Sequence, residues 1–239
     1  MPRFFIDGAA DGRAYITGAD ALHIAKALRM RPGEAMTLCD GKGTDFDGVL
    51  ETVTDRQVTV RITASRPSQA EPTLAVTLYQ GLPKGDKMDW IVQKAVELGV
   101  TAVVPVATRR SVARLEGKAD KKQERWQRIA AEAAGQCGRG ILPAVERPLS
   151  WSQALSRLSE EPALVFYEGG GQPLRELVTP STRRLSVFVG PEGGFDPEEI
   201  DAFRRQGGGV ATLGPRILRC ETAPLAALTL LMHLSGNME

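Results

Sequence analysis

Residues 185–199, with the sequence LSVFVGPEGGFDPEE, decide how the chain is expected to fold. The apolar run Leu185–Val189 predicts a buried strand, and the glycine-rich Gly190–Gly194 follows it directly. Asp196 suits the N-cap of a helix and Glu199 its third position, so a capping box is predicted. The glycines therefore lie between a strand and a helix, where a ligand can approach the backbone closely. A tight turn that binds nothing is the alternative, because the loop matches no standard phosphate-binding pattern.

A second loop of the same kind lies further along the chain. A strand-like run ending at Leu213 leads into Gly214–Thr222, with the sequence GPRILRCET, and an apolar helix follows. Two loops from consecutive units at the carboxyl edge of a parallel sheet are expected to lie side by side and form one pocket. Arg219 and Glu221 flank this pocket as charged residues. A surface arginine and a helix cap are the alternative roles for them.

Strand and helix patterns alternate from Leu74 onward, which predicts a mostly parallel sheet covered by helices. The expected strands are 74–80, 102–106, 163–167, 185–189 and 209–213. The expected helices are 85–98, ending at Gly99, then 120–136, 150–158, 197–205 and 221–234.

The N-terminal part of the chain is expected to form a small β-barrel or sandwich. Its short alternating or β-branched runs predict strands at 3–6, 35–39, 45–53 and 57–62, with one helix at 20–27. The Pro/Ser-rich stretch 64–73 predicts a linker. We therefore expect two domains, residues 1–70 and 71–239.

The composition excludes several classes of protein. The 239 residues are 42% hydrophobic and 25% charged, which excludes disorder as the main state. No apolar run approaches the roughly 18 residues of a membrane-spanning helix, and the N-terminus lacks a signal peptide, so a cytoplasmic protein without membrane attachment is expected. Three separated cysteines and two histidines predict neither a disulfide framework nor a metal site.

The charge is unevenly distributed along the chain. The formal net charge is +1, but residues 72–139 carry 12 basic and 7 acidic groups, a balance of +5. A basic face inside a neutral protein is the pattern expected of a polyanion-binding protein. Solvated helix surface is the alternative for Lys118–Arg125. Arg109 and Arg110 differ, because they follow the apolar run Val103–Ala107 and so are expected at the carboxyl end of a strand.

The chain resembles the ribosomal RNA small subunit methyltransferase E family, within the knotted SPOUT class of S-adenosylmethionine-dependent RNA methyltransferases. The resemblance extends over nearly the whole chain and rests on the order and spacing of its motifs. They are 27–30 (ALRM), 84–88 (KGDKM), 93–99 (QKAVELG), 110–111 (RS), 125–126 (RW), 132–139 (EAAGQCGR), 190–194 (GPEGG), 213–219 (LGPRILR) and 221–222 (ET).

This resemblance implies a fold class, an activity and partners. It implies an α/β protein with a small N-terminal PUA-like β-barrel that binds RNA, a C-terminal SPOUT parallel-sheet domain with a trefoil knot, and a homodimer. The implied activity is methylation of the N3 atom of one uridine in the decoding region of 16S ribosomal RNA, on the small ribosomal subunit. The implied cofactor is S-adenosyl-L-methionine.

The resemblance also implies the cofactor-binding residues. They are Tyr167, Glu168, Gly190, Pro191, Glu192, Gly193, Gly194, Leu213, Gly214, Ile217, Leu218, Arg219 and Thr222. Cys220 and Ala223 stand where hydroxyl residues are common in the family, so a hydroxyl hydrogen bond to the cofactor is not assured at these positions.

Methylation at N3 of uracil requires removal of its weakly acidic proton or stabilisation of the resulting anion. Arg219 is the first candidate to stabilise the anion, and Glu221 or Glu168 is the candidate to take the proton. His23 and His233 lie on apolar helical stretches and are expected to have no role in catalysis.

Contacts to RNA phosphates are expected from cations in the N-terminal domain and in the basic middle of the chain. These are Arg3, Arg29, Arg31, Lys84, Lys87, Arg109, Arg110, Arg114, Arg128 and Arg139. The few large aromatic residues are expected in cores, so RNA recognition is expected to rest on charge and shape. Two other functions stay open: a non-catalytic RNA-binding or ribosome-assembly factor, and a knotted enzyme that acts on transfer RNA or on a ribose hydroxyl.

Overall fold

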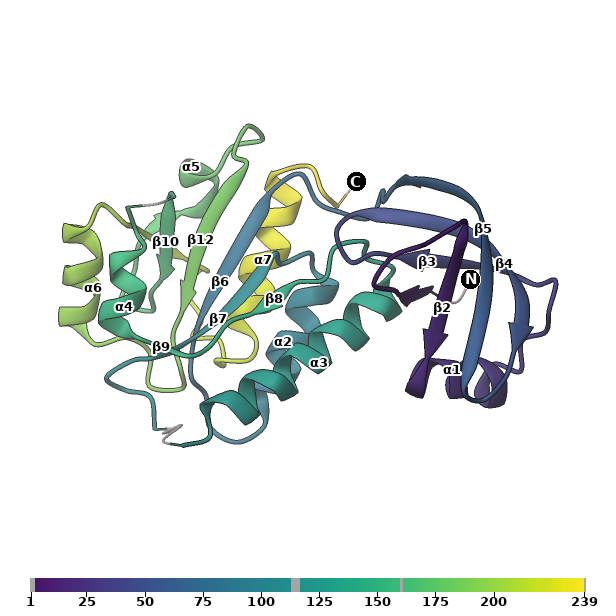
Figure 1. Cartoon of the computed structure of the whole chain (residues 1–239). Coiled ribbons are helices and arrows are strands. Elements are labelled where there is room, and N and C mark those ends of the chain that lie inside the picture. The colour runs from purple at the N-terminus through teal and green to yellow at the C-terminus, as the bar shows by residue number, and fades with distance from the viewer. Residues whose placement is uncertain (1–2, 113–116, 160, 239) are drawn as a thin grey trace. The chain divides into compact units, whose positions relative to one another are not determined.

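The computed structural model describes residues 3–112, 117–159 and 161–238. These residues form two compact units (Figure 1). The first unit contains the chain up to Glu71 together with Ala134–Leu142, and the second contains Pro72–Ala133 and the chain from Pro143 onward.

The first unit is built on a five-stranded sheet in the order β1-β3-β4-β5-β2. Its pairings are antiparallel except for the parallel pair of β1 and β3. The sheet encloses a core in which Ile24, Met36, Leu38, Val58 and Val60 are completely buried. The elements are β1 (Arg3–Phe5), β2 (Arg13–Thr17), α1 (Gly18–Leu22), the π-helical turn η1 (His23–Ala27), β3 (Ala35–Cys39), β4 (Thr44–Val53) and β5 (Gln57–Pro67).

Two predictions for this unit are wrong. Strand β2 is absent from the prediction, although Ala14 and Ile16 point inward and alternate with exposed neighbours. The predicted linker begins too early, because β5 continues through Pro67. The extension is held by pairing with β4 and by Arg66, which donates to Asp45 and to Asp47.

Glu71 ties the chain that follows α3 (Ala119–Cys137) to the first unit. Its carboxylate accepts hydrogen bonds from Arg139 Nη2 at 2.6 Å, Gly140 N at 2.8 Å and Ile141 N at 2.9 Å. Cys39 Sγ also donates to the carbonyl of Gly140 at 2.9 Å. For this reason residues 134–142 belong to the first unit, whereas the sequence places them in the second.

The second unit is built on an eight-stranded sheet whose pairings are all parallel. The strand order is β11-β13-β10-β12-β6-β7-β8, and β9 pairs with β7. The strands are β6 (Ala75–Gly81), β7 (Ala102–Ala107), β8 (Ala144–Val145), β9 (Leu149–Ser150), β10 (Ala163–Phe166), β11 (Gln172–Pro173), β12 (Arg184–Val189) and β13 (Gly209–Thr212). Besides α3, the helices are α2 (Lys87–Glu97), α4 (Trp151–Ser156), α5 (Leu174–Leu177), α6 (Pro197–Arg205) and α7 (Ala223–Leu234).

The predicted strand and helix alternation of this unit is confirmed, and the sequence missed only very short elements. Strands β8, β9 and β11 have two residues each and helix α5 has four, too few to show a periodicity. The predicted capping box of α6 is present: Asp196 accepts from Glu198 N at 3.1 Å, and Glu199 accepts from Asp196 N at 2.9 Å. Gly99, at φ +89°, ends α2 as predicted.

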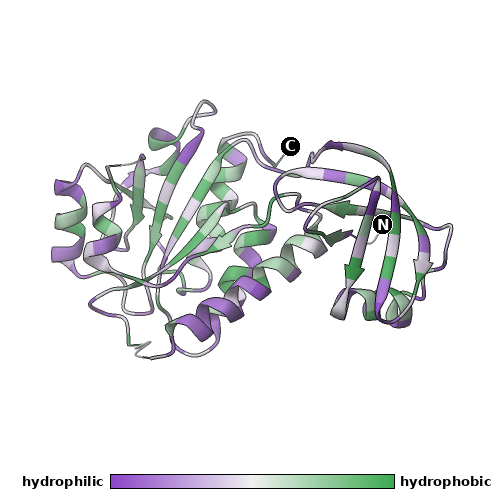
Figure 2. Cartoon of the chain, viewed as in Figure 1, coloured by the Kyte–Doolittle hydropathy of each residue, from purple (hydrophilic) through white to green (hydrophobic). Residues whose placement is uncertain are grey.

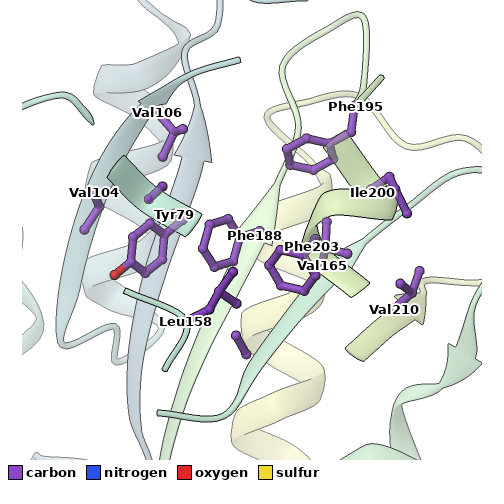
Figure 3. Close-up of a cluster of buried hydrophobic side chains, with 12 residues drawn as sticks. Tyr79, Val104, Val106, Leu158, Val165, Phe188, Phe195, Ile200, Phe203 and Val210 are labelled. Atoms are coloured by element: carbon purple, nitrogen blue, oxygen red, sulfur yellow. The ribbon is translucent and has the colours of Figure 1, made fainter. Parts of the chain in front are cut away.

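Helices cover both faces of the parallel sheet (Figure 1). On the face covered by α4 and α6, Phe188 of β12 stacks on Tyr79 with ring centres 4.2 Å apart and meets the edge of Phe203 at 5.0 Å (Figure 3). Helices α2 and α7 pack against each other on the other face. Figure 2 shows hydrophobic residues concentrated in these strands and hydrophilic residues along α3 and α6. Because β12 is buried on both faces, its carboxyl end is firmly held.

The strands that precede the two glycine-rich loops are not neighbours in the sheet. Strand β10 lies between β12 and β13 and pairs with both. The expectation that the two loops lie side by side is therefore wrong in this detail, because sequence order does not reveal a strand inserted between them. The loop that follows β10 takes the place between them.

The Glu71 contacts predict a dependence of stability on pH. Burial alone would raise the pKa of Glu71, but the hydrogen bonds and the charge of Arg139 outweigh it and hold the pKa below its ordinary value. The carboxylate thus stabilises the fold above the ordinary pKa, and this stabilisation is lost as the pH falls through the lower folded-state pKa. Glu71→Gln should cost about 3 kcal/mol at neutral pH, and the difference from the unchanged protein should shrink in acid.

Chemical denaturation followed by circular dichroism between neutral and acidic pH measures this effect. Glu51→Gln is the control, since Glu51 forms an exposed ion pair with Arg13 and should leave the denaturation midpoint nearly unchanged. If Glu71→Gln lowers the free energy of unfolding by the same amount at every pH, the charge of Glu71 does not hold the chain that follows α3.

Candidate functional site

A cavity of about 510 Å³ opens at the carboxyl ends of β10, β12 and β13. Three loops form its walls, residues 167–168, 190–194 and 212–220, and we call it the three-loop cavity. Twelve of the thirteen residues predicted to bind a cofactor line it: Tyr167, Glu168, Gly190, Pro191, Glu192, Gly193, Gly194, Leu213, Gly214, Ile217, Leu218 and Arg219. Thr222, the N-cap residue of α7, lies outside the lining.

Seven further residues line the three-loop cavity. They are Lys87, Phe166, Val189, Thr212, Arg216, Cys220 and Ala223. Six of them are sequence neighbours of a predicted residue, so predicted ranges longer by one residue at each end would have included them. Lys87 is different, since it comes from α2 and was predicted to contact RNA phosphates.

The glycine-rich loop 190–194 is packed too closely for larger residues. A Cβ added at Gly81, at the end of β6, would lie 2.6 Å from Pro191 N. A Cβ added at Gly190 would lie 3.0 Å from backbone atoms of Gly194. Gly194 has a φ of +65°, and a Cβ there would collide with the carboxylate of Glu168. The glycines thus bring the loops after β10 and β12 together around the cavity.

Hydrogen bonds hold the same loop from two sides. The side-chain amide of the fully buried Gln80 donates to the carbonyl of Gly190 at 3.3 Å. Arg110 Nη1 donates to the carbonyl of Gly193 at 3.0 Å. The segment after β7 is fixed in turn, because Arg109 N donates to Glu199 Oε1 at 2.9 Å. As predicted, Arg109 and Arg110 therefore lie at the carboxyl end of a strand.

Lys87 connects the glycine-rich loop 190–194 to the segment that follows β13. Its Nζ atom lies 3.0 Å from Glu192 Oε1 and 3.1 Å from Glu221 Oε2. Hydrogen bonds to these two carboxylates raise the pKa of Lys87. Burial opposes ionisation of Glu192, but backbone N–H groups and Lys87 outweigh it and lower its pKa. The pKa of Glu221 is lowered by a hydrogen bond from Cys220, by its own backbone N–H and by Lys87.

Cys220 lies beside this group as a neutral thiol. Burial is the largest cause that raises its pKa to about 12, and the hydrogen bond to Glu221 adds to it. The Sγ atom donates to Glu221 Oε2 at 3.2 Å and lies 3.6 Å from Lys87 Nζ. Lys87, Glu192, Glu221 and Cys220 therefore form one connected cluster with one cation and two carboxylates, which we call the Lys87 cluster.

The predicted catalytic residues occupy different places. Arg219 is exposed and lines the three-loop cavity, and its carbonyl accepts from Thr222 N at 2.8 Å and from Ala223 N at 2.9 Å. Glu221 belongs to the Lys87 cluster and does not line the cavity. On the same loop the apolar Ile217 side chain is 86% exposed, which leaves it available to cover a bound ligand.

Two predicted phosphate contacts are wrong. Arg3 forms an ion pair with the buried Asp45, and Arg139 pairs with Glu71 while its side chain is only 4% exposed. A buried guanidinium bound to a carboxylate does not reach a phosphate in solvent. The prediction failed because sequence shows the position of a charge but not its partner.

Apart from Lys87, which belongs to the Lys87 cluster, the other predicted RNA-contacting cations fall into three groups. Arg109 and Arg110 are exposed but form ion pairs with Asp196, and Arg109 also pairs with Glu198. Four cations are exposed: Arg29, Arg31, Lys84 and Arg128. Arg114 lies outside the described residues.

Trp90, expected in a core, is 50% exposed, and Lys94 lies over its ring.

Residues 3–112, 117–159 and 161–238 contain no group of three or more His, Cys, Asp or Glu side chains that could hold a metal ion. No helix within the same ranges is both long and apolar enough to cross a membrane.

Two family models match the chain. The model of an RNA methyltransferase domain matches residues 69–232, and the model of an RNA methyltransferase PUA domain matches residues 16–63. Ribosomal RNA small subunit methyltransferase E of Bacillus subtilis (strain 168) is 37% identical over 227 residues, which cover 91% of this chain and 89% of the relative. The protein of the same name from Mycobacterium tuberculosis is 32% identical over 235 residues, covering 94% and 88%.

Two solved structures are similar over nearly their whole length. Ribosomal RNA small subunit methyltransferase E from Neisseria gonorrhoeae, bound to S-adenosyl methionine, has a TM-score of 0.89 at 33% identity and covers 98% of each chain. A methyltransferase from Legionella pneumophila, in complex with the bound cofactor SAM, has a TM-score of 0.88 at 31% identity and covers 97% of each chain.

The packing of loop 190–194 predicts the effect of a small substitution. Gly194→Ala should destabilise the protein by about 2 kcal/mol, because the new methyl group collides with Glu168 and the backbone conformation is unfavourable for alanine. Gly207→Ala is the matched control: Gly207 also has a positive φ, +86°, but a Cβ there meets no atom within 4 Å. Thermal denaturation should show the larger loss for Gly194→Ala. Equal losses would mean that the contact with Glu168 carries no weight.

Proposed function

This chain belongs to the ribosomal RNA small subunit methyltransferase E family, and from this membership we propose that it methylates the N3 atom of one uridine in the decoding region of 16S ribosomal RNA, on the small ribosomal subunit. That it is an S-adenosylmethionine-dependent ribosomal RNA methyltransferase follows from its named relatives and from the cofactor-bound structures it resembles. The expected fold class, a SPOUT-type parallel-sheet domain with a PUA-like N-terminal domain, is confirmed as well.

The three-loop cavity fits S-adenosylmethionine. Its volume of about 510 Å³ lies within the range of about 300 to 1,000 Å³ usual for small-molecule sites. Apolar side chains of Phe166, Val189, Leu213 and Leu218 suit the adenine ring, and the glycines of loop 190–194 let a ligand approach the backbone closely. The combination of apolar lining side chains and a glycine-rich loop is the observation that supports a cofactor site here.

We propose that Arg219 and Glu168 act on the target base. When bound, S-adenosylmethionine supplies a methyl group on a positively charged sulfur. Arg219, exposed at the cavity wall, would stabilise negative charge on the uracil. Glu168 lines the cavity and would take the N3 proton. Glu221 is the weaker candidate, because Lys87 and Cys220 already occupy its carboxylate and its pKa is lowered.

We propose that RNA binds through the PUA-like domain and through the exposed cations Arg29, Arg31, Lys84 and Arg128. The +5 balance of residues 72–139 supports this assignment, although ion pairs engage several of those charges. We also propose that the enzyme is a cytoplasmic homodimer whose second domain carries a trefoil knot, as the family resemblance implies.

The product of the reaction tests the proposed function. Small subunits that lack the modification, and free 16S RNA, are incubated with the protein and isotopically labelled S-adenosylmethionine, and the nucleosides are analysed by mass spectrometry. N3-methyluridine should form at one position, and subunits that already carry the modification should accept no label. Label on another nucleoside would redirect the proposal to a different target, and the absence of label would favour a non-catalytic assembly factor.

The proposed phosphate contacts predict that RNA affinity depends on salt. With about four cations neutralising phosphates, the affinity should fall on the order of 100-fold between about 50 and 200 mM salt. Replacing Arg29 and Arg31 by glutamine should reduce the slope by about two phosphate contacts, whereas replacing the buried Arg139 tests stability instead. Filter binding over a salt series measures the slope, and a flat response would rule out these contacts.

A further inference from the structure

Lys87 faces the three-loop cavity from a direction that neither glycine-rich loop supplies. It is the first residue of α2, its side chain is 35% exposed, and it lines the cavity together with Glu192 and Cys220. The two carboxylates of the Lys87 cluster hold its ammonium group at 3.0 and 3.1 Å. The positive charge of Lys87 is therefore fixed in position at the edge of the three-loop cavity.

One hydrogen of this ammonium group is only weakly engaged. An ammonium group has three N–H donors, and Glu192 and Glu221 accept two of them. The third neighbour is Cys220 Sγ at 3.6 Å, and a thiol sulfur is a weak acceptor. An oxygen acceptor that enters the cavity can replace the sulfur at little cost. The Lys87 cluster thus keeps one charged donor available for a ligand.

The net charge of the cluster indicates what kind of acceptor suits it. Lys87, Glu192 and Glu221 together carry a net charge of −1, since the pKa values of both carboxylates are lowered and that of Lys87 is raised. A phosphate would meet two carboxylates within hydrogen-bond distance of the same ammonium group, which opposes its approach. A neutral carbonyl oxygen meets no such repulsion. The environment of Lys87 therefore favours the edge of a base over the RNA backbone.

Uracil presents the matching chemistry. Two carbonyl oxygens, O2 and O4, flank its N3 atom, and they share the negative charge when N3 loses its proton. We propose that Lys87 Nζ donates a hydrogen bond to one of these carbonyl oxygens of the target uracil and stabilises the anion formed at N3. In the balanced step, the proton leaves N3 for a carboxylate or water, the N3 lone pair forms the bond to the methyl carbon, and the electrons of the carbon–sulfur bond stay on sulfur.

This role deepens the function proposed above and rests on it. Arg219 on the loop after β13 and Lys87 on α2 both line the three-loop cavity. Each of the two oxygens that flank N3 of the uracil can therefore accept a hydrogen bond from its own cation. Cytosine carries an amino group in place of O4, which an ammonium donor repels. Lys87 is thereby a catalytic residue and also favours uracil over cytosine.

Single-turnover methylation at saturating cofactor tests the proposal with 5-fluorouridine in place of uridine, because fluorine makes the N3 proton more acidic. On uridine RNA, Lys87→Met should lower the rate about 100-fold. On 5-fluorouridine RNA the decrease in rate should be about 10-fold smaller, because the more acidic N3 proton leaves more easily without stabilisation by Lys87. Lys87→Arg should recover part of the rate, and Lys94→Met, on the same helix but paired with Glu97 outside the cavity, should match the unchanged protein.

A fluorine NMR titration gives a second readout that requires no turnover. The N3 pKa of 5-fluorouridine RNA should be about one unit lower when bound to the unchanged protein than when free, and Lys87→Met should abolish this shift. An unshifted pKa, or an equal loss of rate on both RNAs, would overturn the role of Lys87. A protein that makes no N3-methyluridine at all would instead overturn the proposed function, so the two failures are distinguishable.

Discussion

The close backbone packing at the carboxyl end of β12 is the constraint on which the rest of the site depends. Gly81, Gly190 and Gly194 allow three segments to approach within distances that a Cβ would prevent. Because β12 is buried on both faces between β10 and β6, the loop that leaves it starts from a fixed point. The adjacent capping box of α6 fixes the other end of the loop. The cavity is consequently formed before any ligand binds.

Many of the charged side chains in this protein form internal connections. Lys87 joins the loops after β12 and β13, Arg110 holds the glycine-rich loop from outside, and Arg139 holds the chain after α3 to the first unit. A polyanion can therefore compete for only part of the basic middle segment. The net charge of +1 therefore does not measure how many cations are available to a polyanion.

The sequence predicted most of the second unit because its signals are local. The buried run 185–189 and the cap at Asp196 act within a few residues, and both were confirmed. The partners of Arg3 and Arg139 lie 42 and 68 residues away, so no local pattern reveals that these guanidiniums are buried. The place of β10 between β12 and β13 is likewise a property of the sheet and not of its strands. For the same reason only the structure reveals the contacts of Lys87 with Glu192 and Glu221.

We propose that the loops after β10, β12 and β13 form one cofactor site. Hydrogen–deuterium exchange with and without S-adenosylmethionine tests it most directly, because it reports on each loop separately. Residues 167–169, 190–194 and 213–219 should become protected together at the same cofactor concentration, while exchange in β3 and β4 of the first unit should not change. Protection confined to one loop, or located in the first unit, would contradict it.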